Sequence, residues 1–121
     1  MNESAYTRSV NKLLDPEIHA WKINARYAGG VPDCWYSGPK TDLWVEWKLV
    51  QKIGKKVTPK LSALQKRWLN RRHDEGRNVS VIIGSPAGGV IITHKQWNEP
   101  YVVMDILSKR EIANWINDYL T

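Results

Sequence analysis

The chain has 121 residues and a formal net charge of +6, with 42% hydrophobic and 25% charged residues. This balance predicts one globular domain, residues 1–121, built around a single core. Its one cysteine, Cys34, has no intrachain disulfide partner and excludes a cysteine-based metal cluster. No apolar run approaches the roughly 18 residues of a membrane span, and the polar N-terminus lacks a signal-peptide pattern. We therefore expect a cytoplasmic protein, in a cell or in an infected cell, with no membrane partner.

The first part of the chain predicts a helix followed by a strand. Asn2 can cap a helix over residues 2–14, where apolar residues recur at helical spacing. Pro16 ends this helix, because the residue before a proline avoids the helical region. Apolar and polar residues alternate over residues 18–27, which predicts a strand. The glycines at 29–30 permit close approach of another backbone.

The rest of the chain predicts four more strands and two more helices. The strands are expected over residues 34–37, 42–50, 78–84 and 90–93. One helix is expected over residues 58–74, where Thr58 and Pro59 form a favourable start, and another over residues 108–120. Residues 94–107 have no clear period, and packing is the expected role of their aromatic residues. The resulting order predicts an α/β fold with an α-β-β-β-α-β core, in which helices flank a mixed sheet.

The strand over residues 42–50 carries the most informative pattern. Side chains two residues apart share one face of a strand, so Glu46 and Lys48 lie together, with Trp44 beside them. A second carboxylate, Asp33, comes from just upstream. Two carboxylates suit a hard divalent cation whose oxygen shell is completed by water and phosphate. The pattern therefore indicates metal-assisted hydrolysis of a phosphodiester.

These residues resemble the signature of the PD-(D/E)xK nuclease superfamily. Pro32-Asp33 matches its first part, and Glu46-Trp47-Lys48 matches its second. The surrounding sequence, with LSALQKRWL downstream over residues 61–69, resembles the VRR-NUC branch of the superfamily. The resemblance is to the small stand-alone form found in phages and bacteria. The resemblance covers roughly residues 3–92 and implies a restriction-endonuclease-like fold and a DNA endonuclease.

The resemblance also implies how the metal is held. Asp33, Glu46 and the backbone carbonyl of Trp47 are expected to bind Mg²⁺, for which Mn²⁺ can substitute, since both ions accept oxygen ligands. Lys48 is expected to orient a water molecule or to neutralise charge on the phosphate. For a strand Glu-x-Lys taken alone, a surface ion pair is the ordinary interpretation.

Two further polar residues join the candidate site through the resemblance. Many members of the superfamily carry a third acid on the first helix, and here Glu3 is that candidate, with Glu17 as the alternative. Without the resemblance, Glu3 is an acid favoured by the helix dipole. Gln65 corresponds to an active-site glutamine in the helix after the catalytic strand. Its alternative role is that of a residue at the boundary of an apolar face.

Basic residues are concentrated next to the candidate site. Residues 46–77 hold ten Lys and Arg against three Asp and Glu, a difference of +7 that accounts for the whole net charge. Such a surplus favours a polyanion, and we expect contacts with the DNA backbone. The expected contact residues are Lys22, Arg26, Lys52, Lys55, Lys56, Lys60 and Lys66.

The substrate remains open between two classes of DNA. Stand-alone VRR-NUC-like proteins suggest branched DNA such as a Holliday junction, and two symmetric cuts in a junction imply a homodimer. A site-specific endonuclease of the restriction or homing type is the alternative on the same scaffold. A third hypothesis is a non-catalytic, basic nucleic-acid-binding domain whose carboxylates only pair with Lys48.

Overall fold

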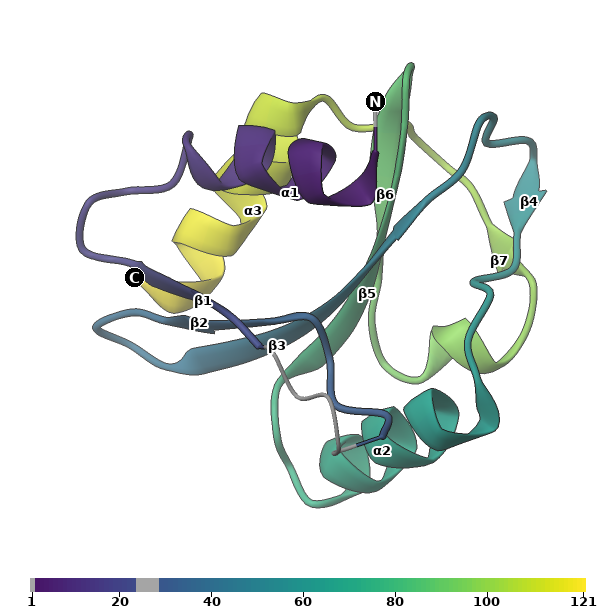
Figure 1. The fold of residues 1–121 in the computed structure, drawn as a ribbon, viewed down its shortest axis with the longest axis horizontal. Coiled ribbons are helices and arrows are strands. Elements are labelled where there is room, and N and C mark those ends of the chain that lie inside the picture. The colour runs from purple at the N-terminus through teal and green to yellow at the C-terminus, as the bar shows by residue number, and fades with distance from the viewer. Residues whose placement is uncertain (1, 24–28) are drawn as a thin grey trace.

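The computed structural model describes residues 2–23 and 29–121, and Figure 1 shows their arrangement. Helices and strands follow the expected order, with three short elements added between them. The elements are α1 (Glu3–Asn11), β1 (His19–Lys22), β2 (Cys34–Ser37), β3 (Asp42–Leu49), β4 (Lys56–Val57), α2 (Ala63–Asp74), β5 (Val79–Ser85), β6 (Gly88–Ile92), the 3₁₀ helix η1 (Gln96–Asn98), β7 (Tyr101–Val102) and α3 (Lys109–Leu120).

The main sheet has five strands in the order β1-β2-β3-β5-β6, so β3 lies in its middle. Strand β3 pairs antiparallel with β2 and parallel with β5, and the other pairs are antiparallel. A parallel pair needs a crossover connection, and α2 lies within the crossover from β3 to β5. The expected mixed sheet flanked by helices is therefore confirmed.

Each face of the sheet is covered by different elements. Helices α1 and α3 pack side by side over one face, and α2 lies on the opposite side (Figure 1). Under α1 and α3, the core includes Val45 and Trp47 of β3. Their side chains lie on the opposite face of β3 from the Glu46 side chain. On the other face, Leu69 of α2 and Trp97 of η1 join a second cluster with residues of β5 and β6, namely Val79, Val81, Ile83, Val90 and Ile92. Packing, the role expected for Trp97, is confirmed.

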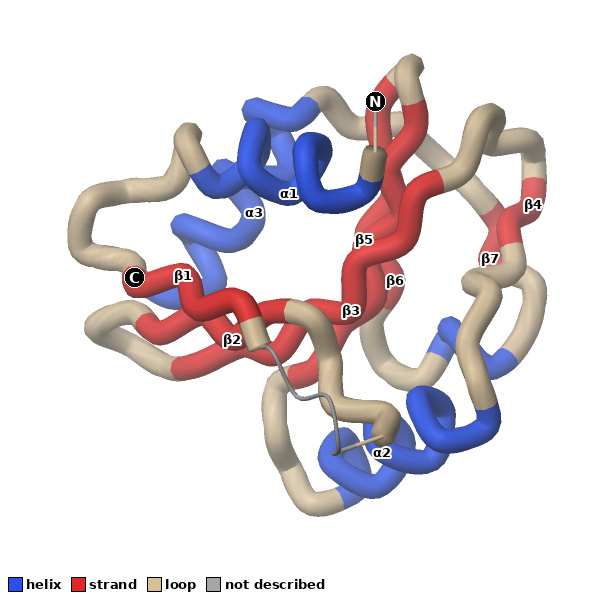
Figure 2. Tube along the Cα trace, viewed as in Figure 1, coloured by secondary structure: helices blue, strands red, loops and turns tan. Residues whose placement is uncertain are grey.

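A two-stranded sheet formed by β4 and β7 stands apart from the main sheet, and the sequence pattern did not predict it (Figure 2). Lys56 pairs with Val102, and Val57 pairs with Tyr101. Two residues are too few to show the alternation that identifies a strand, and the two segments are far apart in the sequence. The basic loop after β3 is thus held at its far end by backbone pairing.

The predicted start of α2 at Thr58 was wrong. The helix begins at Ala63, where the Ser62 side chain accepts a hydrogen bond from Gln65 N and the Gln65 side chain accepts one from Ser62 N. This capping box satisfies backbone groups that a helix end leaves free. Leu64, in the first turn of this helix, is 52% exposed.

The first helix and first strand are shorter than predicted. Helix α1 ends at Asn11, after which Leu13 and Leu14 donate hydrogen bonds to carbonyls three residues back, as in a turn. Strand β1 covers His19–Lys22. The remainder of the predicted strand includes residues 24–27, and with them Arg26, which lie outside the described residues.

Candidate active site

Glu46 and Lys48 lie near the end of β3, on the face that their two-residue spacing predicts. Lys48 Nζ lies 3.4 Å from Glu46 Oε2. Glu46 is only 2% exposed, whereas Lys48 is half-buried. A buried carboxylate is costly unless it is paired, so the ammonium group offsets part of that cost. The surface ion pair considered from sequence therefore does not describe this pair, because Glu46 is in the interior.

Gln65 joins this pair from the first turn of α2. Its amide Nε2 donates to Glu46 Oε2 at 3.1 Å, and its Oε1 accepts from Ser62 N at 2.9 Å. Lys48 Nζ lies 3.4 Å from the same Oε1. The capping box thus fixes which end of the amide faces the carboxylate. The sequence pattern did not reveal this, although Ser62-x-x-Gln65 is a recognisable cap.

Asp33 lies immediately before β2, next to the end of β3. Its Oδ2 accepts a hydrogen bond from Trp47 N at 3.1 Å, and its carbonyl accepts one from Ile23 N at 2.7 Å. The N–H and C=O of one strand residue point to the same side of the strand. The carbonyl of Trp47 therefore points toward the side on which Asp33 lies.

Glu3 approaches Asp33 from the start of α1. Both residues line one cavity of about 280 Å³, together with Lys22, whose Nζ lies 3.4 Å from Ser4 Oγ. Burial first, and then the negative charge of Asp33, raise the pKa of Glu3. Glu17, the alternative third acid, is exposed in the connection between α1 and β1 and does not line this cavity. The structure therefore places Glu3, and not Glu17, beside Asp33.

The Asp33 carboxylate disfavours ionisation of both Glu3 and Glu46. Burial, followed by the nearby Asp33 carboxylate, raises the pKa of Glu46 to about 7, although Lys48 opposes the shift. Burial also raises the pKa of Asp33, against the hydrogen bond from Trp47 N. Glu46 Oε1 is buried and has no hydrogen-bond partner among the described residues. A clustered negative charge with a free carboxylate oxygen is a site that a cation would stabilise.

The donor set fits a divalent metal that retains several water ligands. No three His, Cys, Asp or Glu side chains in residues 2–23 and 29–121 lie together at the spacing of a metal cluster. The fit therefore rests on the free oxygen of Glu46, on Asp33 and on the carbonyl of Trp47. Mg²⁺ usually binds through one or two carboxylates and keeps much of its water, so this set suits it.

Most of the predicted DNA-contacting lysines lie on exposed segments between the catalytic strand β3 and helix α2. Lys52 and Lys55 lie in the loop after β3, Lys56 in β4, and Lys60 before α2, and all four are exposed. Lys66 is half-buried in the first turns of α2. The loop is anchored by Ile53, which is buried against the second core cluster. These lysines are thus available to a polyanion that reaches Glu46.

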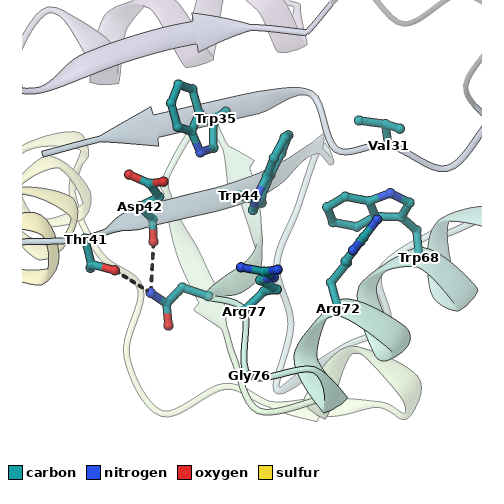
Figure 3. A pocket seen from close by; sticks show the side chains of 10 residues that line it. Val31, Trp35, Thr41, Asp42, Trp44, Trp68, Arg72, Gly76 and Arg77 are labelled. Atoms are coloured by element: carbon teal, nitrogen blue, oxygen red, sulfur yellow. Dashed lines mark hydrogen bonds between the residues drawn. The ribbon is translucent and has the colours of Figure 1, made fainter.

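The sequence reasoning missed one feature on the same face of the sheet. A cavity of about 560 Å³ is bounded by Trp35 of β2, Trp44 of β3 and Trp68 of α2, with Arg72 and Arg77 at its side (Figure 3). Sequence patterns assigned no common site to these three of the chain's seven tryptophans. Strand register brings Trp35 opposite Trp44, and sequence periodicity alone does not specify register.

The order of elements and the mixed sheet define a restriction-endonuclease-like fold, as predicted. A solved structure with this arrangement is that of Hjc from Archaeoglobus fulgidus, described as a Holliday junction resolvase from an archaeal hyperthermophile. The similarity has a TM-score of 0.59 at 15% sequence identity and covers 93% of this chain and 96% of Hjc. No protein-family model and no curated protein sequence matches the chain. Among the described residues, no helix is long and apolar enough to cross a membrane.

Proposed function

We propose that this chain is a metal-dependent DNA endonuclease that hydrolyses phosphodiester bonds in branched DNA such as a Holliday junction. The observation that carries the proposal is the contact of buried Glu46 with both Lys48 and Gln65, beside Asp33. Similarity to the fold of Hjc and the +7 charge of residues 46–77 support a nucleic-acid substrate. The proposed nuclease unit is the whole of residues 1–121.

Each residue of the site has a role in this proposal. Asp33, Glu46 and the Trp47 carbonyl would hold Mg²⁺ or Mn²⁺, and Glu3 would hold a water molecule beside them. Such an ion would supply a water molecule of lowered pKa and positive charge opposite the phosphate. Lys48 orients the attacking water or neutralises that charge. Gln65 keeps the Glu46 carboxylate in place through its amide.

The homodimer follows from the proposed substrate. Resolution of a four-way junction requires two symmetric cuts, and each copy of the chain supplies one Glu46. A closed two-fold pair is the commonest symmetric assembly and matches the symmetry of such a junction. The lysines of the loop after β3 then contact the DNA backbone near each cut. Lys22 lines the cavity shared by Glu3 and Asp33. In this proposal it contacts a backbone phosphate of the same DNA strand.

The proposal is tested by cleavage of three substrates: a mobile four-way junction, a linear duplex of the same sequence and a supercoiled plasmid. Each is incubated with Mg²⁺, Mn²⁺ or EDTA, with wild type, Glu46→Ala and Lys48→Ala. Asp118→Ala and Lys40→Ala are matched controls. Both residues are exposed, and their substitution removes the same charges as the site variants do, but away from the site. Paired cuts in the junction, lost with EDTA and with both site variants but not with the controls, are the expected result.

Two other outcomes assign the chain to the alternative classes. Discrete cuts in the duplex or plasmid, without preference for the junction, indicate a site-specific endonuclease. Salt-dependent binding without cleavage in any metal indicates a non-catalytic nucleic-acid-binding domain. Full cleavage by Glu46→Ala overturns the site assignment whatever the substrate.

A further inference from the structure

Four tryptophans form a continuous row across the face of the sheet that carries Glu46. We call Trp21, Trp35, Trp44 and Trp68 the tryptophan row. Trp21 lies opposite Trp35, and Trp35 lies opposite Trp44, so the first three share one face of β1, β2 and β3. Their ring centroids are 6.3 Å and 6.2 Å apart, and Trp68 of α2 lies 5.3 Å from Trp44.

The row is partly open to solvent, unlike the fully buried Trp47 and Trp97, although Trp44 and Trp68 also pack against the second core cluster. Trp21 is 57% exposed, and the other three members are partly exposed. The indole N–H groups of buried Trp47 and Trp97 donate to Tyr36 and Asn70. Within the part of the chain that the structure describes, no indole N–H of the row donates a hydrogen bond.

The hollow beside the row has a basic side. Its volume of about 560 Å³ lies within the range of about 300–1,000 Å³ typical of small-molecule sites. Figure 3 shows Trp35, Trp44 and Trp68 along one side and the guanidinium groups of Arg72 and Arg77 facing them. The Arg72 guanidinium lies 5.5 Å from the Trp68 ring, in cation–π geometry. Asp42 is the acid in its lining, and Arg72 also pairs with Glu75 at 2.9 Å. Arg77 has no ion-pair partner among the described residues and supplies the remaining positive charge.

We propose that the tryptophan row and its two arginines form a stacking site for unpaired nucleobases of the cleaved DNA strand. Aromatic side chains stack with any base, and arginines hold the backbone phosphates, which is the usual composition of a single-strand site. A fully paired duplex keeps its bases stacked on one another and cannot use the row. The inference rests on the proposed nuclease function only for the identity of the strand that is bound.

The position of the row relative to the candidate active site supports this assignment. Trp44 precedes Glu46 by two residues on β3, a separation of about 6.8 Å on the same face. Trp68 follows Gln65 by three residues on α2, so both side chains lie on one side of the helix. A strand whose phosphate lies at Lys48 therefore brings its neighbouring nucleotides over Trp44 and Trp68.

A second copy of the chain fits this surface less well than a nucleobase. In a two-fold interface the same patch meets itself, so a hollow would face a hollow and leave a void. Arg72 and Arg77 would also approach their own copies, because a basic patch meets a basic patch. A planar base with its phosphate fills the hollow and matches its charge.

The test measures binding in EDTA, where cleavage does not occur. Two probes are compared: a short oligothymidylate and an abasic oligonucleotide of the same length and charge. Wild type is expected to bind the oligothymidylate more tightly and to show quenched tryptophan fluorescence. Trp35→Leu is expected to weaken that binding about 5- to 150-fold, the usual effect of losing one base–aromatic stack. Its affinity for the abasic probe is expected to be unchanged.

Matched variants separate stacking from charge and from folding. Trp35→Tyr keeps an aromatic face and is expected to retain the preference for bases. Arg77→Ala is expected to weaken the binding of both probes equally. Trp115→Leu is the tryptophan control, because Trp115 lies on α3 against Tyr119 and outside the row. If Trp35→Leu does not fold, Trp21→Ala replaces it, since Trp21 is the most exposed member of the row.

Three results would overturn the stacking site. One is equal wild-type affinity for the two probes, and another is an unchanged preference for bases in a folded Trp35→Leu or Trp21→Ala variant. The third is conversion of a wild-type dimer to a monomer by either variant, measured by sedimentation, which would identify the row as an interface between copies. Failure of the nuclease proposal is distinguishable, because Glu46→Ala and Lys48→Ala test cleavage and leave the row intact.

Discussion

The amide of Gln65 connects the N-terminus of α2 to the buried carboxylate of Glu46. One end of the amide accepts from the backbone N–H of Ser62 at 2.9 Å, and the other donates to Glu46 Oε2 at 3.1 Å. An amide with its acceptor end occupied can present only its donor end to the carboxylate. The cap that begins the helix therefore also orients a residue of the candidate active site.

Substitution of Gln65 by Glu separates these two roles. Glu at this position of a capping box still accepts the hydrogen bond from Ser62 N, so α2 is expected to keep its stability. Its second oxygen, however, faces Glu46 as an acceptor and a like charge instead of a donor. We expect a roughly 10- to 100-fold loss of metal affinity or cleavage, as for other residues that position metal ligands. Cleavage rates and thermal unfolding of Gln65→Glu and Gln65→Ala check this.

Comparison of Gln65→Glu with Gln65→Ala separates the role of Gln65 in the helix cap from its role as a donor to Glu46. Gln65→Ala removes the reciprocal hydrogen bond of the cap, so it is expected to lose about 1 kcal/mol of stability as well as activity. Wild-type cleavage by Gln65→Glu would show that the amide donor has no part in the site.

Local sequence patterns predicted that Glu46 and Lys48 lie together in the candidate site. The features that these patterns missed depend on contacts between segments that are far apart in the sequence. Glu46 and Lys48 share a face because strand side chains alternate, a rule that needs no knowledge of the fold. Ser62-x-x-Gln65 is equally local, but Thr58 and Pro59 offered a competing helix start. The helix uses the Ser62 cap, while the preceding Lys56–Val57 pairs with β7, a contact that only the tertiary structure supplies.

The tryptophan row is a second feature that local sequence patterns did not predict. Trp21, Trp35 and Trp44 lie on three different strands, and they align because of the register of two antiparallel pairs. Register depends on turns and on the packing of whole strands, which single-strand periodicity does not determine. The close approach expected at the glycines of 29–30 is real, but the neighbouring backbone is that of α2 at Leu64 and Gln65.

The raised pKa of Glu46 predicts a pH-dependent gain of stability in Glu46→Gln. The pKa is about 7 in the folded protein and near 4.5 without the fold, so the folded state binds the proton more tightly. The contribution of Glu46 to stability is thus fully present below about pH 4.5, falls as the pH rises to 7, and is constant above it. Glu46→Gln is expected to raise the free energy of unfolding at pH 8 by on the order of 2 kcal/mol, and to change it little at pH 4.

Urea unfolding in EDTA at the two pH values measures this difference. Addition of Mg²⁺ at pH 8 is expected to stabilise the wild type and to stabilise Glu46→Gln much less, because binding to the folded state alone raises stability. An equal effect of Glu46→Gln at both pH values would contradict the shifted pKa.

Gly30 is expected to be essential for the position of α2. Its φ of +89° lies in the left-handed region, and an added Cβ would collide with the Leu64 carbonyl oxygen. Gly76 provides a matched control, because its φ of +85° is similar but an added Cβ meets no atom within 4 Å. Gly76→Ala is expected to cost only the backbone strain of about 1–2 kcal/mol. Gly30→Ala is expected to cost more and to reduce cleavage, since α2 carries Gln65. Equal losses of stability with unchanged cleavage would show that the contact with α2 is unimportant.

The exposed lysines around the site are expected to set the salt dependence of DNA binding. Each phosphate contact adds about 0.9 to the slope of log affinity against log salt for duplex DNA. Lys55→Ala combined with Lys60→Ala should therefore lower the slope by about 1.8 and weaken junction and duplex binding alike. Lys12→Ala with Lys40→Ala removes the same charge from exposed positions away from the loop and should leave the slope nearly unchanged. Anisotropy titrations in EDTA over a series of salt concentrations measure both slopes. If both double variants lower the slope equally, the effect is one of net charge, and the loop after β3 does not contact the DNA backbone.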